Sequence, residues 1–480
     1  MKGDNELRKA TLNMKSDQDV IAQINGLFHP RSVAIVGAPR GVKTGAVFLT
    51  ALLEQGFPGV IYPVNPHAEE ISGIKAYAKV ADIPGPVDLA IILVPHWNSI
   101  AVVKECAAKG VKGAVLFTSG YKETGTAQGT ALEEELVRVA REAGMRLIGP
   151  NGMGLYCPKT GLSFFPGVSK EPGPVGILAH SGSLTNILGR LAPRKGIRFS
   201  KVISSGNDCD LTAADFLIYL GQDAETGLIG SYIEGIKDGP YFLRALEQAS
   251  LKKPVIIWKV GLTQEGARAS ASHTGALSGS REIWQAVERQ TGAVRAVGFE
   301  AWVDALMGFS LLPENIGRNM AIISGPGGLA VSAAEACGNE GLCLASLSEQ
   351  TQSQLSDFVP STGTSTRNPV DVSLSAHLDL TIFRRSAETV ARDPGVDAVA
   401  IIGGGLTPED SQTFVRYMIE VQQECRKPLI IVAIPGYERN LSQEFCQAGI
   451  PFFESAERAM RTYALVFHHQ RWRQEHAALG

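Results

Sequence analysis

The chain has 480 residues, of which 44% are apolar and 19% charged, a composition typical of a globular protein with about two to four domains. Its net charge of −3 argues against bulk binding of nucleic acid, which needs a strongly basic face. The seven cysteines are scattered, and no apolar run reaches the ~20 residues of a membrane span, so we expect reduced thiols in a cytoplasmic protein that does not enter a membrane. The first six residues lack the apolar core of a signal peptide.

After an N-terminal extension of residues 1–25, a first block of alternating strand and helix patterns covers residues 26–160. Apolar runs predict strands at 32–37, 59–66, 88–95, 113–119 and 146–151, and a helix at 44–55. Continuous apolar strands that alternate with helices indicate a parallel sheet covered on both faces. The predicted strands end in Gly, Pro, Asn or Ser, at the edge where such sheets usually bind ligands.

The loop at 37–45, between the first strand and the first helix, is suited to an anion. Its glycines allow close approach of the backbone, the following helix N-terminus favours negative charge, and Arg40 and Lys43 are cationic. The spacing is not G-x-G-x-x-G, and the second strand ends at Asn65 and Pro66 without the acidic residue that would hold an NAD ribose. These features argue against a nicotinamide oxidoreductase. We therefore expect this loop to bind a phosphorylated ligand other than NAD, and the alternative is a turn that binds no ligand.

Two further blocks repeat the α/β pattern. The second, residues 165–312, has strand patterns at 175–179, 201–205, 228–233 and 254–260. The third, residues 318–475, has strand patterns at 319–324, 398–402 and 429–433, follows a linker at 311–317, and ends in a polar segment at 467–473 that we expect to be helical. The sequence therefore predicts an α/β protein built on three parallel sheets.

Small residues follow a strand in each of the later blocks. In the second block, a turn at Ser181 and Gly182 precedes a helix predicted to start near Leu184. Free N–H groups at this turn would bind a phosphate, or Ser181 would act only as a helix N-cap. The analogous turn at 324–328 in the third block is best interpreted as a turn alone.

The segment 269–279 predicts a loop in which His273 lies among Ser, Thr and Gly residues. Such a loop lets an imidazole approach an anion, and a histidine can carry a transferred group covalently. Glu234, at the end of an apolar strand, could accept a hydrogen bond from an imidazole and leave the other ring nitrogen nucleophilic. A solvated histidine and a solvated glutamate are the alternatives, His180 is a second candidate histidine, and no spacing predicts a metal site.

Taken in order, these motifs resemble the NDP-forming acyl-CoA synthetases, relatives of succinyl-CoA ligase. The matching motifs lie at 32–45, 62–66, 149–154, 181–182, 232–235, 272–276 and 368–372. The resemblance extends over residues 26–475 and implies a Rossmann-like CoA-binding domain followed by two flavodoxin-like domains. It also implies an acid–thiol ligase that interconverts a carboxylic acid, CoA and NTP with an acyl-CoA, NDP and phosphate.

The same resemblance implies roles for individual residues. His273 would be phosphorylated during turnover, Glu234 would support it, and Ser181, Gly182 and Gly275 would hold the phosphoryl group. An acyl phosphate would form, and the histidine would carry the phosphoryl group to and from a distant nucleotide. The implied CoA site comprises Gly37, Ala38, Pro39, Arg40, Lys43, Gly45, Asn65, Pro66, Val94, Pro95, Ser119 and Gly120.

The sequence departs from the family pattern in three places. No segment matches the nucleotide-binding ATP-grasp domain, so we expect an α-type subunit whose separate β-type ATP-grasp partner holds Mg²⁺ and NTP or NDP. Ala179 and His180 replace the usual Ser-Gln, and Ser332 replaces the usual Asp of the third domain. These departures favour, as an alternative, a non-catalytic CoA- or acyl-CoA-binding sensor or scaffold, although the presence of both His273 and Glu234 argues against it.

Overall fold

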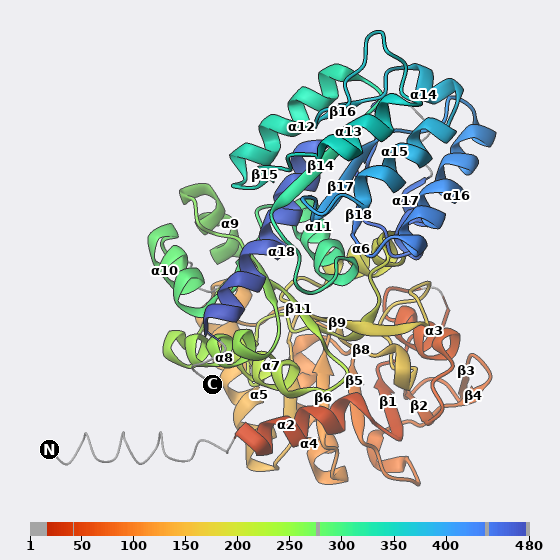
Figure 1. Ribbon diagram of the computed structural model, residues 1–480. Helices are drawn as coiled ribbons and strands as arrows, with labels where there is room; N and C mark the ends of the chain where they lie inside the picture. The colour runs from red at the N-terminus through yellow and green to blue at the C-terminus, as the bar shows by residue number, and fades with distance from the viewer. Residues whose placement is uncertain (1–16, 42, 275–278, 437–440, 477–480) are drawn as a thin grey trace, which may run out of the picture. The chain divides into compact units, whose positions relative to one another are not determined.

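The computed structural model describes residues 17–41, 43–274, 279–436 and 441–476, with backbone alone at 271–274 (Figure 1). The chain forms two compact units, one of Met1–Arg190 with Phe199–Arg295 and one of Leu191–Arg198 with Ala296–Gly480. The described part of the first unit contains two large sheets and the hairpin β3 (Glu70–Ile71) and β4 (Ile74–Lys75), whereas that of the second unit contains one sheet. The predicted α/β class with parallel sheets is confirmed.

The first sheet is fully parallel and has the strand order β2-β1-β5-β6-β7. Its strands are β1 (Ser32–Val36), β2 (Val60–Val64), β5 (Leu89–Ile92), β6 (Gly113–Leu116) and β7 (Arg146–Ile148), as the five apolar runs predict. The helices that connect these strands are α3 (Ala46–Gln55), α4 (His96–Lys109) and α5 (Ala127–Glu142), of which α4 and α5 lie side by side (Figure 1). The chain leaves β1 in one direction for β2 and returns on the other side for β5, so the carboxyl edge beside β1 is a topological switch point.

The second sheet has the order β13-β12-β11-β9-β10-β8. Its strands are β8 (Gly154–Tyr156), β9 (Pro172–Ala179), β10 (Phe199–Ser204), β11 (Leu228–Ile233), β12 (Val255–Lys259) and β13 (Val294–Arg295). All pairings are parallel except that of β8 with β10. The sequence analysis did not predict β8, because it has three residues and directly follows a turn. Helix α6 (Gly182–Leu191) begins two residues before the predicted start, and α7 (Ala213–Gln222) and α8 (Gly239–Lys252) connect the following strands.

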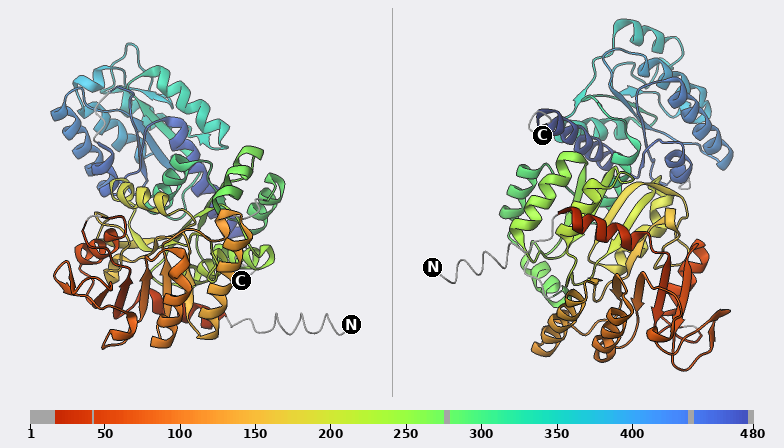
Figure 2. Two further views of the ribbon diagram at one scale, coloured as in Figure 1. Left: turned by 180° about the vertical axis from the view of Figure 1, so that it is seen from behind. Right: turned by 90° about the horizontal axis from the view of Figure 1, so that it is seen from below.

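Helix α2 (Asp17–Phe28) lies beside α7 on one face of the second sheet (Figure 2). The ring of Phe28 stacks on that of Tyr219 with 5.6 Å between centroids, and the Tyr219 hydroxyl lies 3.2 Å from the Asn25 side-chain oxygen. Arg244 on α8 pairs with Asp17 at 2.9 Å. Most of this helix falls in the segment expected to be an extension, yet it packs as an integral part of the first unit.

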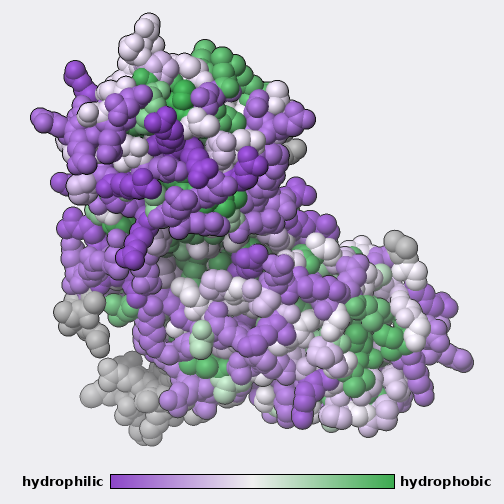
Figure 3. Space-filling model, turned by 45° about the vertical axis from the view of Figure 1, so that its right-hand side comes forward, coloured by the Kyte–Doolittle hydropathy of each residue, from purple (hydrophilic) through white to green (hydrophobic). Residues whose placement is uncertain are grey.

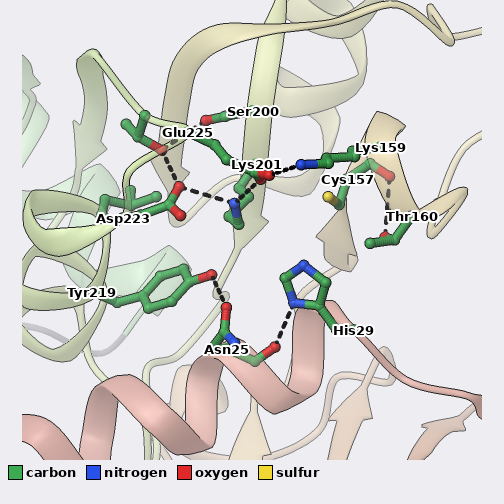
Figure 4. A network of polar contacts seen from close by, with 12 residues as sticks. Asn25, His29, Cys157, Lys159, Thr160, Ser200, Lys201, Tyr219, Asp223 and Glu225 are labelled. Carbon is green, nitrogen blue, oxygen red and sulfur yellow. Dashed lines mark hydrogen bonds and ion pairs between the residues drawn. The ribbon is translucent and has the colours of Figure 1, made fainter.

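A buried ion-pair network fixes β10 to the loop that follows α7 (Figure 4). The Lys201 side chain has no exposed surface, and its ammonium lies 2.9 Å from Asp223 and 2.7 Å from Glu225. Thr226 also donates to Asp223 and shares a hydrogen bond with Ser200. Burial lowers the pKa of Lys201, but the two carboxylates more than offset it, so the lysine remains charged.

The third sheet, in the second unit, is fully parallel with the order β15-β14-β17-β18-β19, and β16 also pairs with β14. Its strands are β14 (Asn319–Ser324), β15 (Cys343–Leu344), β16 (Val370–Asp371), β17 (Ala398–Ile402), β18 (Leu429–Val432) and β19 (Phe452–Phe453). The main helices of this unit are α11 (Phe299–Leu311), α12 (Gly327–Asn339), α13 (Glu349–Ser356), α15 (Thr381–Ala391), α16 (Pro408–Glu424), α17 (Leu441–Gln447) and α18 (Ala456–His476). Helix α18 includes the segment 467–473, which was predicted to be helical.

The surface drawn in Figure 3 is mostly hydrophilic, with smaller hydrophobic areas between the polar ones. Among the helices in the described part of the chain, none combines the length and apolar character needed to cross a bilayer.

We predict that Lys201→Ala destabilises the first unit by about 3 kcal/mol, because it removes the fully buried cation that pairs with the half-buried carboxylates of Asp223 and Glu225. The measurement is the urea midpoint followed by circular dichroism. The control is Arg138→Ala, since Arg138 pairs with Glu135 and Glu142 on the exposed face of α5 and should leave the midpoint unchanged. Equal midpoints for Lys201→Ala and the unsubstituted chain would contradict this account of the network.

Candidate active site

The loops that follow β1 and β2 are joined at the carboxyl edge of the first sheet. The N–H groups of Gly37 and Ala38 donate to the Val64 carbonyl at 2.9 and 3.2 Å, and the Asn65 amide donates to the Ala38 carbonyl at 2.8 Å. Gly37 has φ +85°, and a Cβ there would lie 3.0 Å from a Val94 methyl carbon. Glycine therefore lets the loop after β1 lie against the loop after β5.

The loops that follow β5 and β6 meet at the same edge. Pro95 is the N-cap of α4, and the Thr118 hydroxyl donates to the Val94 carbonyl at 2.7 Å. Gly120 has φ +116° and lies so close to His96 that a Cβ would overlap the imidazole ring. The structure thus gathers the residues of the expected CoA site along one edge.

These gathered residues differ in their exposure. Arg40, Lys43, Pro66, Pro95 and Ser119 are exposed, whereas Ala38 is buried. The others, Gly37, Pro39, Gly45, Asn65, Val94 and Gly120, are half-buried. An exposed cationic rim above a glycine-lined floor is suited to a phosphorylated ligand that lies against the main chain.

The turn at the carboxyl end of β9 begins helix α6. The Leu184 N–H lies 3.4 Å from the Ser181 hydroxyl, which makes Ser181 a weak N-cap. A Cβ at Gly182 would lie 2.6 Å from the Met153 side chain, so the turn packs closely on the segment that precedes β8. The first N–H groups of this helix carry partial positive charge and favour an anion.

His180, directly before this turn, is buried and hydrogen-bonded through both ring nitrogens. Its Nδ1 accepts the Glu234 N–H at 3.2 Å, so Nε2 carries the proton and donates to Asp208 at 3.1 Å. Burial lowers the pKa of His180, but the carboxylates of Asp208 and Glu234 more than offset it and raise that pKa above its ordinary value.

Glu234, directly after β11, is also buried, and its main chain is held from two sides. Its N–H donates to His180, while its carbonyl accepts from the Lys259 ammonium and the Ser270 hydroxyl, each at 3.0 Å. Burial lowers the pKa of Lys259 to about 8, and the Glu234 charge partly opposes this shift. Among the described side chains, the histidine beside Glu234 is His180. The Glu234 main-chain N–H, not its carboxylate, makes the hydrogen bond to this ring.

The expectation of a loop around His273 is wrong for part of that segment. Helix α9 (Gln264–Thr274) includes the backbone of His273, because alanines at 267, 269 and 271 favour a helix and no β-branched residue precedes Thr274. The His273 side chain and Gly275 lie outside the described residues, so their predicted roles stay predictions.

Sequence reasoning missed Asp208, Lys259 and Ser270. The sequence offers one clue to Lys259, because a charged residue at the end of a buried apolar strand needs a nearby partner. It offers another clue to Asp208, which follows a glycine and an asparagine directly after a predicted strand. Neither clue identifies the partner, which for Asp208 is 28 residues away in the chain.

The comparisons with known proteins identify both regions of the first unit. A protein-family model described as a CoA binding domain matches residues 31–158, and one described as a succinyl-CoA ligase like flavodoxin domain matches residues 172–309. The α subunit of acetate–CoA ligase [ADP-forming] II from Pyrococcus furiosus is 38% identical, over 92% of this chain and 96% of that one. The chain belongs to the ADP-forming acetate–CoA ligase α-subunit family. It is thus an α-type subunit of an NDP-forming acyl-CoA synthetase, an acid–thiol ligase, as predicted, and none of these matches supports the non-catalytic alternative.

Further relatives agree with this assignment to the α-subunit family. The α subunit of P. furiosus acetate–CoA ligase [ADP-forming] I is 34% identical, over 94% of this chain and 99% of that one. Acetate–CoA ligase [ADP-forming] I of Archaeoglobus fulgidus is 36% identical, and the α-type chain spans 63% of its length. A solved acetyl-coenzyme A synthetase 1 from Ca. Korarchaeum cryptofilum, described as dinucleotide forming and in complex with phosphate and ADP, matches with a TM-score of 0.83 at 32% identity, over 94% and 97% of the two chains.

For this α subunit we predict that Gly120→Ala weakens CoA binding at least about tenfold, because the new methyl group displaces His96 from the edge that Pro95 and Ser119 share. Isothermal titration calorimetry with CoA is the measurement. Gly298→Ala is the control for backbone strain, since Gly298 has φ +94° but no atom within 4 Å of its Cβ position. Equal losses of affinity in the two variants would show that backbone strain, not the His96 contact, is responsible.

Proposed function

We propose that this chain converts a small carboxylic acid of the acetate type and CoA into an acyl-CoA, with phosphoryl transfer through His273. The observation that carries the proposal is that one loop, residues 205–210, joins the CoA-binding sheet to the turn at the start of α6. Within this loop, Asn207 donates to Glu133 of α5 at 3.0 Å, Asp210 pairs with Arg146 of β7 at 2.8 Å, and Asp208 accepts from His180 at 3.1 Å. A CoA site and an anion-binding turn are therefore held on a common scaffold.

The proposed reaction has three steps. Phosphoryl transfer from NTP forms an N–P bond on His273 and releases NDP. The carboxylate of the acid then attacks phosphorus, so that the N–P bond breaks and an acyl phosphate forms. When bound, CoA would supply the thiol that attacks the acyl carbon; the C–S bond forms, inorganic phosphate leaves with the electron pair of the broken C–O bond, and the thiol proton passes to that phosphate.

The residues of this chain would bind and orient the reactants. Ser181 and Gly182 would present the N–H groups of α6 to the phosphoryl oxygens, together with Gly275. Glu234 would hold a proton on the His273 imidazole and leave its other nitrogen nucleophilic. The buried position of Glu234, and the two hydrogen bonds to its carbonyl, support this role because they restrict where its carboxylate can lie.

The proposed CoA site uses the exposed cations of the first sheet. Arg40 and Lys43 would contact the phosphates, and the glycine turns at Gly37 and Gly45 would let the main chain approach them. Asn65, Pro66, Val94, Pro95, Ser119 and Gly120, with Ala38 and Pro39, would line the remainder of the site. The fit is supported by Gly37 and Gly120, where any side chain would collide with the loop after β5 or with His96.

The relatives' names extend the proposal to substrate and partner. Both P. furiosus relatives are named for acetate, while a 30% identical relative from Nitrosopumilus maritimus is named for 4-hydroxybutyrate, so we propose a short acid. The name "subunit alpha" supports a separate β-type subunit, which we propose is an ATP-grasp protein that holds Mg²⁺ and the nucleotide. All seven cysteines are free thiols, which supports a reducing, cytoplasmic setting.

We predict that the assembled protein acquires an acid-labile, base-stable phosphate on this chain when it is mixed with Mg²⁺ and with NTP that carries a label in its terminal phosphate. His273→Ala should abolish the label, since it removes the acceptor nitrogen. His29→Ala is the control, because His29 is exposed and its ring forms a hydrogen bond with the Asn25 carbonyl of α2. A label that persists in His273→Ala, or no label in the unsubstituted protein, would contradict the proposed function.

A further inference from the structure

The pair of His180 and Asp208 has no role in the proposed reaction, although it lies between the α6 turn and Glu234. Both side chains are buried, and they meet at 3.1 Å although they come from different strand ends of the second sheet. A buried, hydrogen-bonded imidazole cannot serve as a phosphoryl acceptor, because both ring nitrogens are occupied. What this pair does must therefore be sought in the groups it contacts.

Asp208 is itself firmly anchored. The carboxylate oxygen that accepts from His180 also accepts the Ala213 N–H at 2.8 Å, at the first residue of α7. Asp208 has φ +53°, a left-handed conformation that costs energy for any residue with a side chain. The loop maintains this conformation while Asn207 donates to Glu133 of α5 and Asp210 pairs with Arg146 of β7, so it places a carboxylate against the His180 ring.

His180 in turn determines the position of the Glu234 main chain. With Nε2–H directed to Asp208, the lone pair of Nδ1 faces the Glu234 N–H. On the opposite side, Lys259 and Ser270 hold the Glu234 carbonyl. The peptide units on both sides of the Glu234 Cα are thus fixed, and the direction of the carboxylate side chain depends on them.

We propose that His180, oriented by Asp208, is a positioning residue that holds the Glu234 main chain through Nδ1 so that the carboxylate can support phosphoryl transfer. The inference deepens the proposed function and rests on the role given there to Glu234. His180 is a titratable ring paired with a carboxylate, so the positioning depends on pH.

The direction of that dependence follows from the ring chemistry. A protonated imidazole carries hydrogen on Nδ1 and cannot accept the Glu234 N–H, so the contact is lost as the pH falls through the pKa of His180. The charged groups around the ring are Asp208 from the β10 loop, Glu234 from the end of β11 and Lys259 from β12, with Lys237 near Asp208. Burial and Lys259 lower the pKa of His180, but the two carboxylates raise this pKa by more than that. The loss of activity at low pH should therefore have its midpoint above the ordinary histidine value of about 6.5.

The test is the pH profile of kcat between about pH 5 and 8, measured on the chain assembled with its partner subunit. The unsubstituted protein should lose activity as the pH falls, with a midpoint above about 6.5. Asp208→Asn removes a negative charge beside the ring and should move this midpoint to lower pH by at least about half a unit. His180→Gln should remove the part of this acid limb that depends on Asp208 and leave only the loss caused by protonation of the His273 nucleophile, because its amide oxygen accepts an N–H at every pH in this range. His29→Gln should leave the profile unchanged.

A second comparison separates positioning from packing. His180→Leu fills a similar volume but cannot accept the Glu234 N–H, so its kcat at about pH 8 should be at least about tenfold below that of His180→Gln, with KM for CoA equal in the two variants. An acid limb that is the same in the unsubstituted protein, Asp208→Asn and His180→Gln would overturn the inference, as would equal kcat in the Leu and Gln variants. An unsubstituted protein without ligase activity would instead overturn the proposed function.

Discussion

The first compact unit depends on the ion pairs and hydrogen bond that the Asp210 carboxylate forms. Its side chain has no exposed surface and accepts from Arg146 at 2.8 Å, from Arg141 at 2.8 Å and from the Leu147 N–H at 2.9 Å. Burial raises the pKa of Asp210, but the Arg146 guanidinium and the other donors more than offset it and hold that pKa below its usual range. Removing Arg146 would leave the buried Asp210 carboxylate with only the exposed Arg141 as its cation, so the link between the first sheet and the loop after β10 contributes strongly to stability.

This link explains how distant residues reach one site. Parallel strands bring their carboxyl ends to a common edge, which gathers the loops after β1, β2, β5 and β6 in the first sheet and those after β9, β10 and β11 in the second. Asp210 fixes the β10 loop against the first sheet, and two residues earlier Asp208 supports His180. The three consecutive residues 208–210 thus connect the first sheet to the turn at the start of α6.

The fold was largely predictable because continuous apolar runs such as 398–402 have few alternatives to a buried strand. Helix α2 and strand β8 were missed, since α2 is amphipathic and precedes the first strand, and β8 has three residues. The carboxyl-edge positions of Gly37, Asn65 and Gly120 followed from the predicted ends of parallel strands, but the hydrogen bonds around Glu234 did not. A charged residue such as Lys259 has many possible partners in a sequence. Which of them it contacts, here the Glu234 carbonyl, is determined only when the strands of the sheet are paired.

The central claim is that this chain holds the acyl-transfer half of an acyl-CoA synthetase. The most direct test is to mix the purified chain with acetyl phosphate and CoA, without nucleotide, and to follow thioester formation and phosphate release. The account predicts that thioester and phosphate appear in equal amounts and that Gly120→Ala slows both. Thioester formation that requires nucleotide, or no thioester under conditions in which CoA binds, would contradict it.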